Sequence, residues 1–96
     1  MQRVHRNLPR DKVELLRQEL ADLVPKGNTD LPRLMRIMRL IARKSQREYA
    51  QLCGVAPRVL VNIESGKGSP TVETLEKLLR PFGYRVGVVA PANELR

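Results

Sequence analysis

Residues that carry covalent or metal chemistry are nearly absent from this sequence. Its 96 residues include one cysteine, Cys53, and one histidine, His5. A single cysteine excludes an internal disulfide and a thiolate zinc cluster, and it favours a reducing cytoplasm. The sequence also lacks a nucleophile pair of His and Cys, a carboxylate cluster in an apolar segment and a phosphate-binding loop. We therefore expect a protein that is not an enzyme and that uses no cofactor or metal.

Aromatic residues and long hydrophobic runs are equally scarce. There are two tyrosines, one phenylalanine and no tryptophan, so the 42% of hydrophobic residues are mainly aliphatic. Helix packing of aliphatic side chains must then supply the core of a single small domain. No apolar run is long enough to cross a bilayer, and residues 1–25 lack the core of a signal peptide. These features predict a soluble cytoplasmic protein with no membrane partner.

Acidic residues are rare in the middle of the chain. The whole sequence has 18 basic and 10 acidic residues, a formal net charge of +8. Residues 31–70 hold eight of the basic residues against two acidic ones, Glu48 and Glu64, which leaves this segment at +6. Both ends of the chain are nearly neutral. This distribution predicts a surface patch for phosphates, and a merely solvated helix face is the alternative for its exposed bases.

Two helices are expected in the first half of the chain. Asp11 followed by Glu14 is typical of a capping box, and a stripe of apolar residues continues the pattern to about Val24. The stripe is Val13, Leu16, Leu20 and Leu23. It predicts a helix docked on the rest of the domain, with a dimer or partner surface as the alternative. A second helix begins near Asp30 and runs to about Arg43, and its inward residues are Leu34, Ile37, Met38 and Ile41.

The next segment predicts two short helices joined by a tight turn. Ser45 and Glu48 form a capping box for a helix that runs to about Cys53, and Gly54 suits the left-handed residue that follows a helix. Pro57 opens the second helix, which continues to Ser65 with Leu60 and Ile63 facing inward. Such a pair is the helix-turn-helix geometry, in which the second helix enters the major groove of DNA.

A last helix and one strand complete the expected elements. Thr71 caps the helix, whose inward residues are Val72, Leu75, Leu78 and Leu79, and Pro81 stops it. Tyr84 to Val89 are rich in β-branched residues and predict a strand. An isolated strand leaves its backbone groups unpaired, so we expect Tyr84, Val86 and Val88 to lie in a strand that pairs with its own copy across a two-fold axis. A homodimer of this kind suits a palindromic operator.

The motifs of residues 45–83 resemble the phage-repressor/Cro (XRE-type) family. They combine Ser-Gln at the helix start, Ala50-x-x-x-Gly54-Val55, Ile63-Glu64-x-Gly66 and Pro70-Thr71 at family spacing. The resemblance implies an all-α fold: a lambda-repressor-like helix-turn-helix bundle of about five helices, with an additional N-terminal helix and the C-terminal dimer strand. It also implies a partly buried ion pair between Arg39 and Glu64.

The expected contacts with double-stranded DNA divide into two groups. Phosphate contacts are expected from a basic and polar set that includes the clamp residue Gln46 of the family: Ser45, Gln46, Arg47, Arg43, Lys44, Ser65 and Lys67. The base-reading positions depart from the family, because Pro57 and Ala56 replace its usual polar residues. Arg58, Val61 and Asn62 remain on the outward face, and their side chains suit guanine, a thymine methyl group and adenine.

The sequence predicts three regions and a DNA-binding transcriptional repressor associated with the nucleoid. The regions are an N-terminal extension (1–28), the helix-turn-helix domain (29–83) and a dimerisation strand with a tail (84–96). The strand after Gly83 resembles the HipB type of antitoxin, which implies autoregulation and a HipA-type kinase toxin as a partner. A stand-alone regulator and an antitoxin that acts chiefly by sequestering a toxin are the alternatives. RNA binding is disfavoured, because the reading face lacks aromatic residues for stacking.

Overall fold

The computed structural model describes residues 8–24, 30–88 and 90 of the chain. This part contains five α-helices, one 3-10 helix and no strand, which confirms the predicted all-α bundle. In chain order the helices are α1 (Arg10–Leu23), α2 (Leu31–Ile41), α3 (Gln46–Cys53), α4 (Pro57–Glu64), α5 (Val72–Leu79) and η3 (Arg80–Phe82). No helix within the described ranges has the length and apolar character of a membrane-crossing segment.

Three of the predicted helix starts are confirmed by their side-chain caps. Asp30 accepts a hydrogen bond from the N–H of Arg33 at the start of α2. Ser45 forms the complete capping box with Glu48 at the start of α3, and Thr71 caps α5. Each cap satisfies an N–H group that has no partner inside its helix.

The predicted capping box at Asp11 is wrong. The N-cap of α1 is Pro9, whose backbone is extended and makes no side-chain cap, and Asp11 lies inside the first turn. A carboxylate in the first turn still stabilises the helix by interacting with the helix dipole. The acidic pattern therefore identifies the N-terminal end of α1 correctly but not its first residue.

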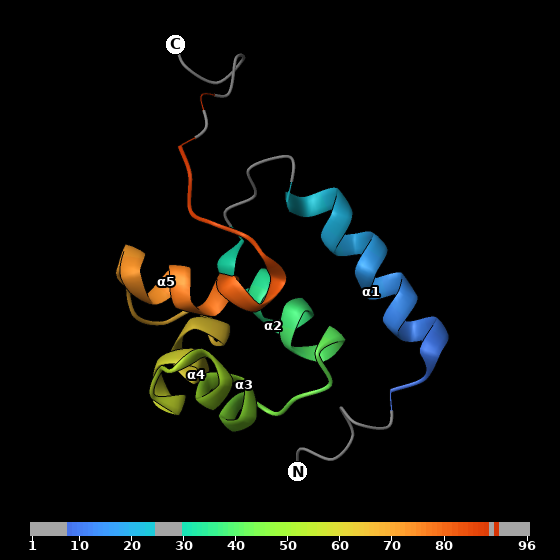
Figure 1. Ribbon diagram of the computed structural model, residues 1–96, viewed down its shortest axis with the longest axis horizontal. Helices are drawn as coiled ribbons and strands as arrows, with labels where there is room; N and C mark the ends of the chain where they lie inside the picture. Colours follow the sequence, from blue (N-terminus) through green and yellow to red (C-terminus); the bar gives the residue numbers. More distant parts are fainter. Residues whose placement is uncertain (1–7, 25–29, 89, 91–96) are drawn as a thin grey trace.

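The core lies around α2, which runs between α1 and the helices that follow it (Figure 1). The largest fully buried side chains there are Met35, Met38, Tyr49, Leu60 and Leu78. Met35 was not among the predicted inward residues, because α2 is covered from two sides and buries a wider face than a surface helix does. The inward prediction for Val72 is wrong, since its side chain is 62% exposed in the first turn of α5.

The N-terminal helix docks on α2. Val13 and Leu20 are buried, while Leu16 and Leu23 pack partly against the core cluster. Glu19 of α1 also accepts hydrogen bonds from the guanidinium of Arg33 at the start of α2. The apolar stripe of α1 is therefore used within the chain, as the docked-helix interpretation predicts.

The last described segment leaves the bundle after a tight turn. Gly83 adopts a left-handed conformation (φ 73°) and ends η3, which contains Pro81. Residues 84–88 then run away from the helices as an extended stretch (Figure 1). They have no strand partner among the described residues, so pairing across a dimer remains a prediction.

Candidate nucleic-acid interface

The turn between α3 and α4 sets the angle of the second helix. Gly54 adopts a left-handed conformation (φ 78°), and its N–H donates to the carbonyl of Ala50. The N–H of Val55 donates to the same carbonyl at 3.0 Å, and the half-buried Val55 side chain packs against the core. The turn is thus held both by its backbone bonds and by an apolar contact. Glycine suits this point because side chains rarely tolerate a positive φ.

The outward face of α4 carries the three predicted base-reading residues. Leu60 and Ile63 are buried on the opposite face. Arg58 is exposed, Val61 is 40% exposed and Asn62 is half-buried. Among the described residues, neither the guanidinium of Arg58 nor the side-chain amide of Asn62 has a hydrogen-bond or ion-pair partner. These two polar groups are therefore available to a ligand that approaches α4.

The start of α4 leaves one backbone donor, the N–H of Arg58, without a partner among the described residues, whereas the N–H of Val59 donates to the carbonyl of Ala56 at 3.0 Å. Ala56 is the N-cap and makes no side-chain cap, and Pro57 at the first position has no N–H to donate. Helix N-termini with unpaired N–H groups attract anions, since the helix dipole adds to the hydrogen bonds. The end of α4 beside Arg58 is consequently suited to a phosphate or to the polar edge of a base.

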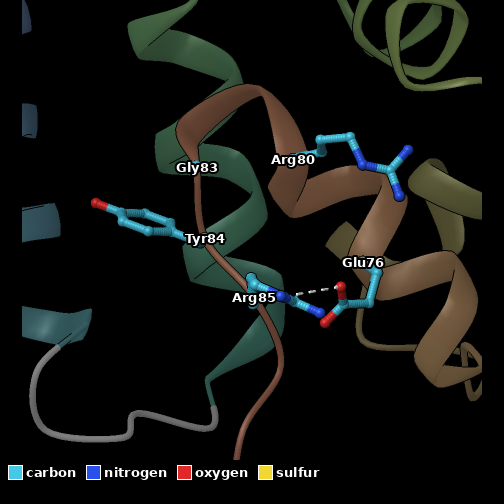
Figure 2. Close-up of a pocket in the computed structure, with 5 residues that line it drawn as sticks. All are labelled: Glu76, Arg80, Gly83, Tyr84 and Arg85. Atoms are coloured by element: carbon cyan, nitrogen blue, oxygen red, sulfur yellow. Dashed lines mark ion pairs between the residues drawn. The ribbon is translucent and has the colours of Figure 1, made fainter.

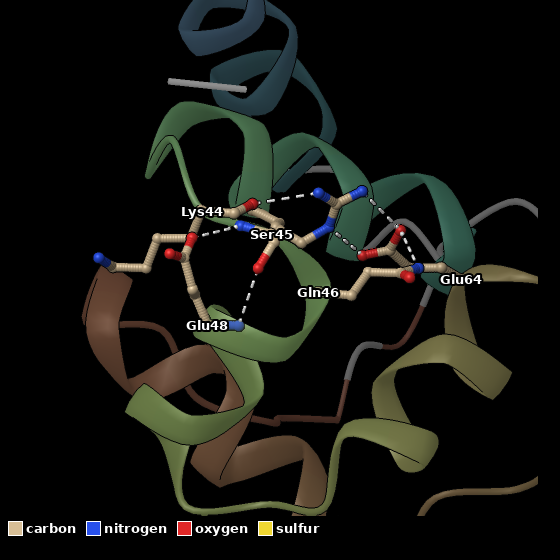
Figure 3. Close-up of polar contacts among 6 residues, drawn as sticks. Lys44, Ser45, Gln46, Glu48 and Glu64 are labelled. Carbon is tan, nitrogen blue, oxygen red and sulfur yellow. Dashed lines mark hydrogen bonds and ion pairs between the residues drawn. The ribbon is translucent and has the colours of Figure 1, made fainter. Parts of the chain in front are cut away.

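A buried ion pair joins the end of α4 to α2 (Figure 3). The Nε of Arg39 lies 2.7 Å from Oε2 of Glu64, and its Nη2 lies 3.0 Å from Oε1. Both side chains are only 7% exposed. The remaining nitrogen, Nη1, donates to the carbonyl of Lys44 at 3.1 Å. Arg39 is therefore occupied by internal contacts and does not point to an external phosphate.

Gln46 connects α3 to the same ion pair. Its Nε2 donates to Oε1 of Glu64 at 3.2 Å, so Arg39 of α2 and Gln46 of α3 bind the same carboxylate at the end of α4 (Figure 3). Such paired and hydrogen-bonded buried charges hold their neighbours in one geometry. The network thereby holds α2, α3 and α4 in one relative arrangement.

The predicted phosphate-contacting residues differ in their exposure to solvent. Arg47, Ser65 and Lys67 are exposed, whereas Arg43, Lys44 and Gln46 are half-buried. Ser45 is 5% exposed, and its hydroxyl accepts from the N–H of Glu48. The Ser45 side chain is thus used in the helix cap and faces inward, which leaves six of the seven residues within reach of the surface.

Both acidic residues of the basic middle segment are taken up by internal contacts. Glu64 pairs with Arg39, and Glu48 accepts from the N–H of Ser45 in the capping box. The positive charge around α3 and α4 is consequently not compensated from within the segment. Two arginines of α2 have acidic partners: Arg39 pairs with Glu64, and Arg33 pairs with Glu19 of α1.

A contact between α3 and α5 had no signal in the sequence. The buried Tyr49 hydroxyl donates to the carbonyl of Leu78 at 2.7 Å, and Cys53 lies 4.0 Å from the same carbonyl. Burial raises the pKa of the Tyr49 phenol and that of the Cys53 thiol. Both side chains therefore stay neutral and serve to pack the helices together.

Comparison with known proteins relates the helix-turn-helix part of the chain to a family. A family model described as helix-turn-helix matches residues 35–89, which is more than half of the chain. The matched range contains the α3–α4 pair, the buried ion pair and the extended segment, while α1 lies before it. Neither the curated proteins nor the solved structures contain a match.

Proposed function

This chain belongs to the XRE-type helix-turn-helix family of DNA-binding transcription regulators, and from that membership we propose that it is a sequence-specific repressor that reads its operator with α4. The observation that carries the proposal is the outward face of α4. It combines two polar side chains that have no partner among the described residues, those of Arg58 and Asn62, with one exposed apolar side chain, Val61.

The three side chains suit the chemistry of base edges in the major groove. The guanidinium of Arg58 is able to donate two hydrogen bonds to O6 and N7 of guanine, and the Asn62 amide pairs with N6 and N7 of adenine. Val61 lies on the same helix face, three residues after Arg58, and offers an apolar contact to a thymine methyl group. Each good bidentate contact is worth about 1–3 kcal/mol of discrimination.

Phosphate contacts position the helix and supply sequence-independent affinity. We assign these contacts to the side chains around α3 and the turn after α4: Arg43, Lys44, Gln46, Arg47, Ser65 and Lys67. Gln46 is held by Glu64, so a phosphate bound there would be fixed relative to α4. Through this link, a contact between Gln46 and a DNA phosphate would set the position of α4 along the major groove.

The repressor acts as a homodimer in this proposal. Val86 and Val88 are 38% and 102% exposed on the extended segment, and pairing with a second copy would cover them. A two-fold dimer places two copies of α4 about one helical turn of DNA apart, which matches a palindromic operator.

Selection of bound duplexes from random DNA tests the proposal. We expect a two-fold symmetric consensus, and we expect Arg58→Ala to remove the preference at one position of each half-site with about a tenfold loss of affinity. Lys67→Ala should instead weaken all sequences alike and reduce the slope of log affinity against log salt by about one. Arg17→Ala on α1 removes the same charge as Arg58→Ala at an exposed site away from α4 and should change neither quantity. A consensus that Arg58→Ala leaves intact at every position would refute the role given to Arg58.

A second candidate is an antitoxin that autoregulates its operon and binds a HipA-type kinase toxin. Two features favour it: the extended segment after Gly83, and α1, which lies outside the matched range and carries Leu15 at 62% exposure. Co-expression with an adjacent reading frame that encodes kinase motifs tests this candidate. A stable complex supports it, and growth inhibition that the full chain does not relieve contradicts it and leaves a stand-alone regulator. Relief that survives Arg58→Ala would indicate sequestration of the toxin as the main activity.

A further inference from the structure

The start of the extended segment is tied to the bundle by side chains. Tyr84 is half-buried, packs against the core cluster and lies with its ring centroid 6.1 Å from that of Phe82. Its N–H donates to the carbonyl of Leu79 at 3.2 Å. Two residues later, the N–H of Val86 donates to Oε2 of Glu76 at 2.7 Å. The segment therefore leaves the bundle in a direction that α5 determines.

These contacts use only one edge of the segment. In an extended chain the N–H and C=O groups of alternate residues point to the same side. Tyr84 and Val86 direct theirs towards the protein's own helix, so Arg85 and Gly87 direct theirs away from it. Among the described residues, the N–H groups of Arg85 and Gly87 have no hydrogen-bond partner. The outer edge is thus unpaired, whereas the inner edge is occupied by α5.

Glu76 also neutralises the charge beside this edge. Its Oε1 lies 3.7 Å from Nε of Arg85, as the dashed line in Figure 2 shows. The Glu76 side chain is 25% exposed and that of Arg85 is 84% exposed. Like charges on facing strands destabilise their pairing. Because each copy brings its own acid to its own arginine, two copies are able to approach edge to edge without that repulsion.

We infer that Glu76 is a positioning residue for the dimer strand and that a second copy of this chain pairs along the outer edge, through the backbone of Arg85 and Gly87. The inference rests on the proposed homodimer and adds to it the edge that is used and the residue that presents it. The backbone edge is self-complementary in an antiparallel arrangement, and the neutral Glu76–Arg85 pair makes the approach of an identical copy electrostatically acceptable.

The test compares hydrogen exchange and dimerisation in the full chain. Exchange measured by NMR across a range of protein concentrations should show concentration-dependent protection of the Arg85 and Gly87 amides but not of the Val88 amide. Glu76→Ala should raise the dissociation constant of the dimer by at least about tenfold, because a charge-assisted hydrogen bond is lost in each copy. Glu73→Ala is the matched control: it removes the same charge from the same helix at a side chain that is 82% exposed, and it should leave the dimer unchanged.

The outcomes separate this inference from the proposed dimer. A chain that stays monomeric at all concentrations refutes both. A symmetric dimer in which the Val88 amide is protected and the Arg85 and Gly87 amides exchange freely overturns the inference alone. The inference also fails if Glu76→Ala and Glu73→Ala give equal dissociation constants of the dimer. It fails as well if the Arg85 and Gly87 amides are protected from hydrogen exchange only when a different protein is added.

Discussion

Removal of Arg39 should destabilise this protein far more than removal of any surface charge. In Arg39→Met the Glu64 carboxylate stays 7% exposed and keeps only the hydrogen bond from Gln46. Breaking a buried ion pair by deleting one partner typically costs about 3–5 kcal/mol, since the remaining charge is left without compensation. A protein of this size has a free energy of unfolding of about 5–14 kcal/mol, so the variant should lose roughly a fifth or more of its stability. At the lower cost the midpoint of thermal unfolding should fall by roughly 12–24 °C.

Urea unfolding of three variants measures this cost and its origin. Arg39→Met should lower the urea midpoint strongly with an unchanged slope, and the double variant Arg39→Met with Glu64→Leu should regain most of the loss, because it buries no unpaired charge. Glu73→Ala provides the surface comparison. It breaks a pair with Lys77 whose side chains are 82% and 39% exposed, and it should cost less than about 1 kcal/mol.

The result that refutes this reasoning is a small loss. If Arg39→Met costs no more than Glu73→Ala, the carboxylate of Glu64 is solvated in solution, and the ion pair does not hold α4 in place. In that case DNA binding should also survive the substitution. If the pair acts as the structure indicates, affinity for the selected operator should fall together with stability at temperatures near the transition.

Two further predictions concern the packing of α3 and the start of α4. Tyr49→Phe should cost about 1 kcal/mol near neutral pH, because the carbonyl of Leu78 loses its hydrogen bond. Burial raises the pKa of Tyr49 above its ordinary value of 10.0, so the unfolded chain ionises at Tyr49 at a lower pH than the folded protein does. The contribution of Tyr49 is therefore complete below pH 10 and is lost as the pH rises above 10. The difference in unfolding free energy between the protein and Tyr49→Phe should shrink in that range, and a constant difference would contradict the burial of the phenol. Ala56→Ser should stabilise the fold by about 1 kcal/mol, because it adds the missing cap to α4, and thermal unfolding without DNA measures this gain. An unchanged midpoint would show that the first turn of α4 is already satisfied in solution.

The elements that the sequence predicted well depend on neighbours within about one helical turn. The caps at Asp30, Ser45 and Thr71 each bond a backbone group three residues ahead, and the turn at Gly54 needs only its own φ angle. Local rules of this kind apply before the chain has folded. Their failure at Asp11 has a local cause as well, since Pro9 offers a start for the helix that the acidic pattern does not reveal.

Which residues face inward was predicted correctly for α4 but not for every residue of α2 and α5. Periodicity identified Leu60 and Ile63 correctly, because α4 has one buried face. It missed Met35 and misplaced Val72, since burial depends on how far a neighbouring helix extends. Periodicity identifies the apolar face of one helix, whereas the area of that face that becomes buried depends also on the helix that packs against it.

By itself, then, the sequence determined the five described α-helices, most of their ends and the outward residues of α4, because these follow from hydrogen bonds and spacing along a few residues. Apart from the Arg39–Glu64 pair, which the family resemblance implied, only the tertiary structure decided which charged and polar groups meet. Arg33 with Glu19, Tyr49 with Leu78 and Glu76 with Val86 are separated by 14, 29 and 10 residues. Contacts over such separations arise from packing, since any of several exposed bases or acids has the same local pattern and only the folded arrangement selects one of them.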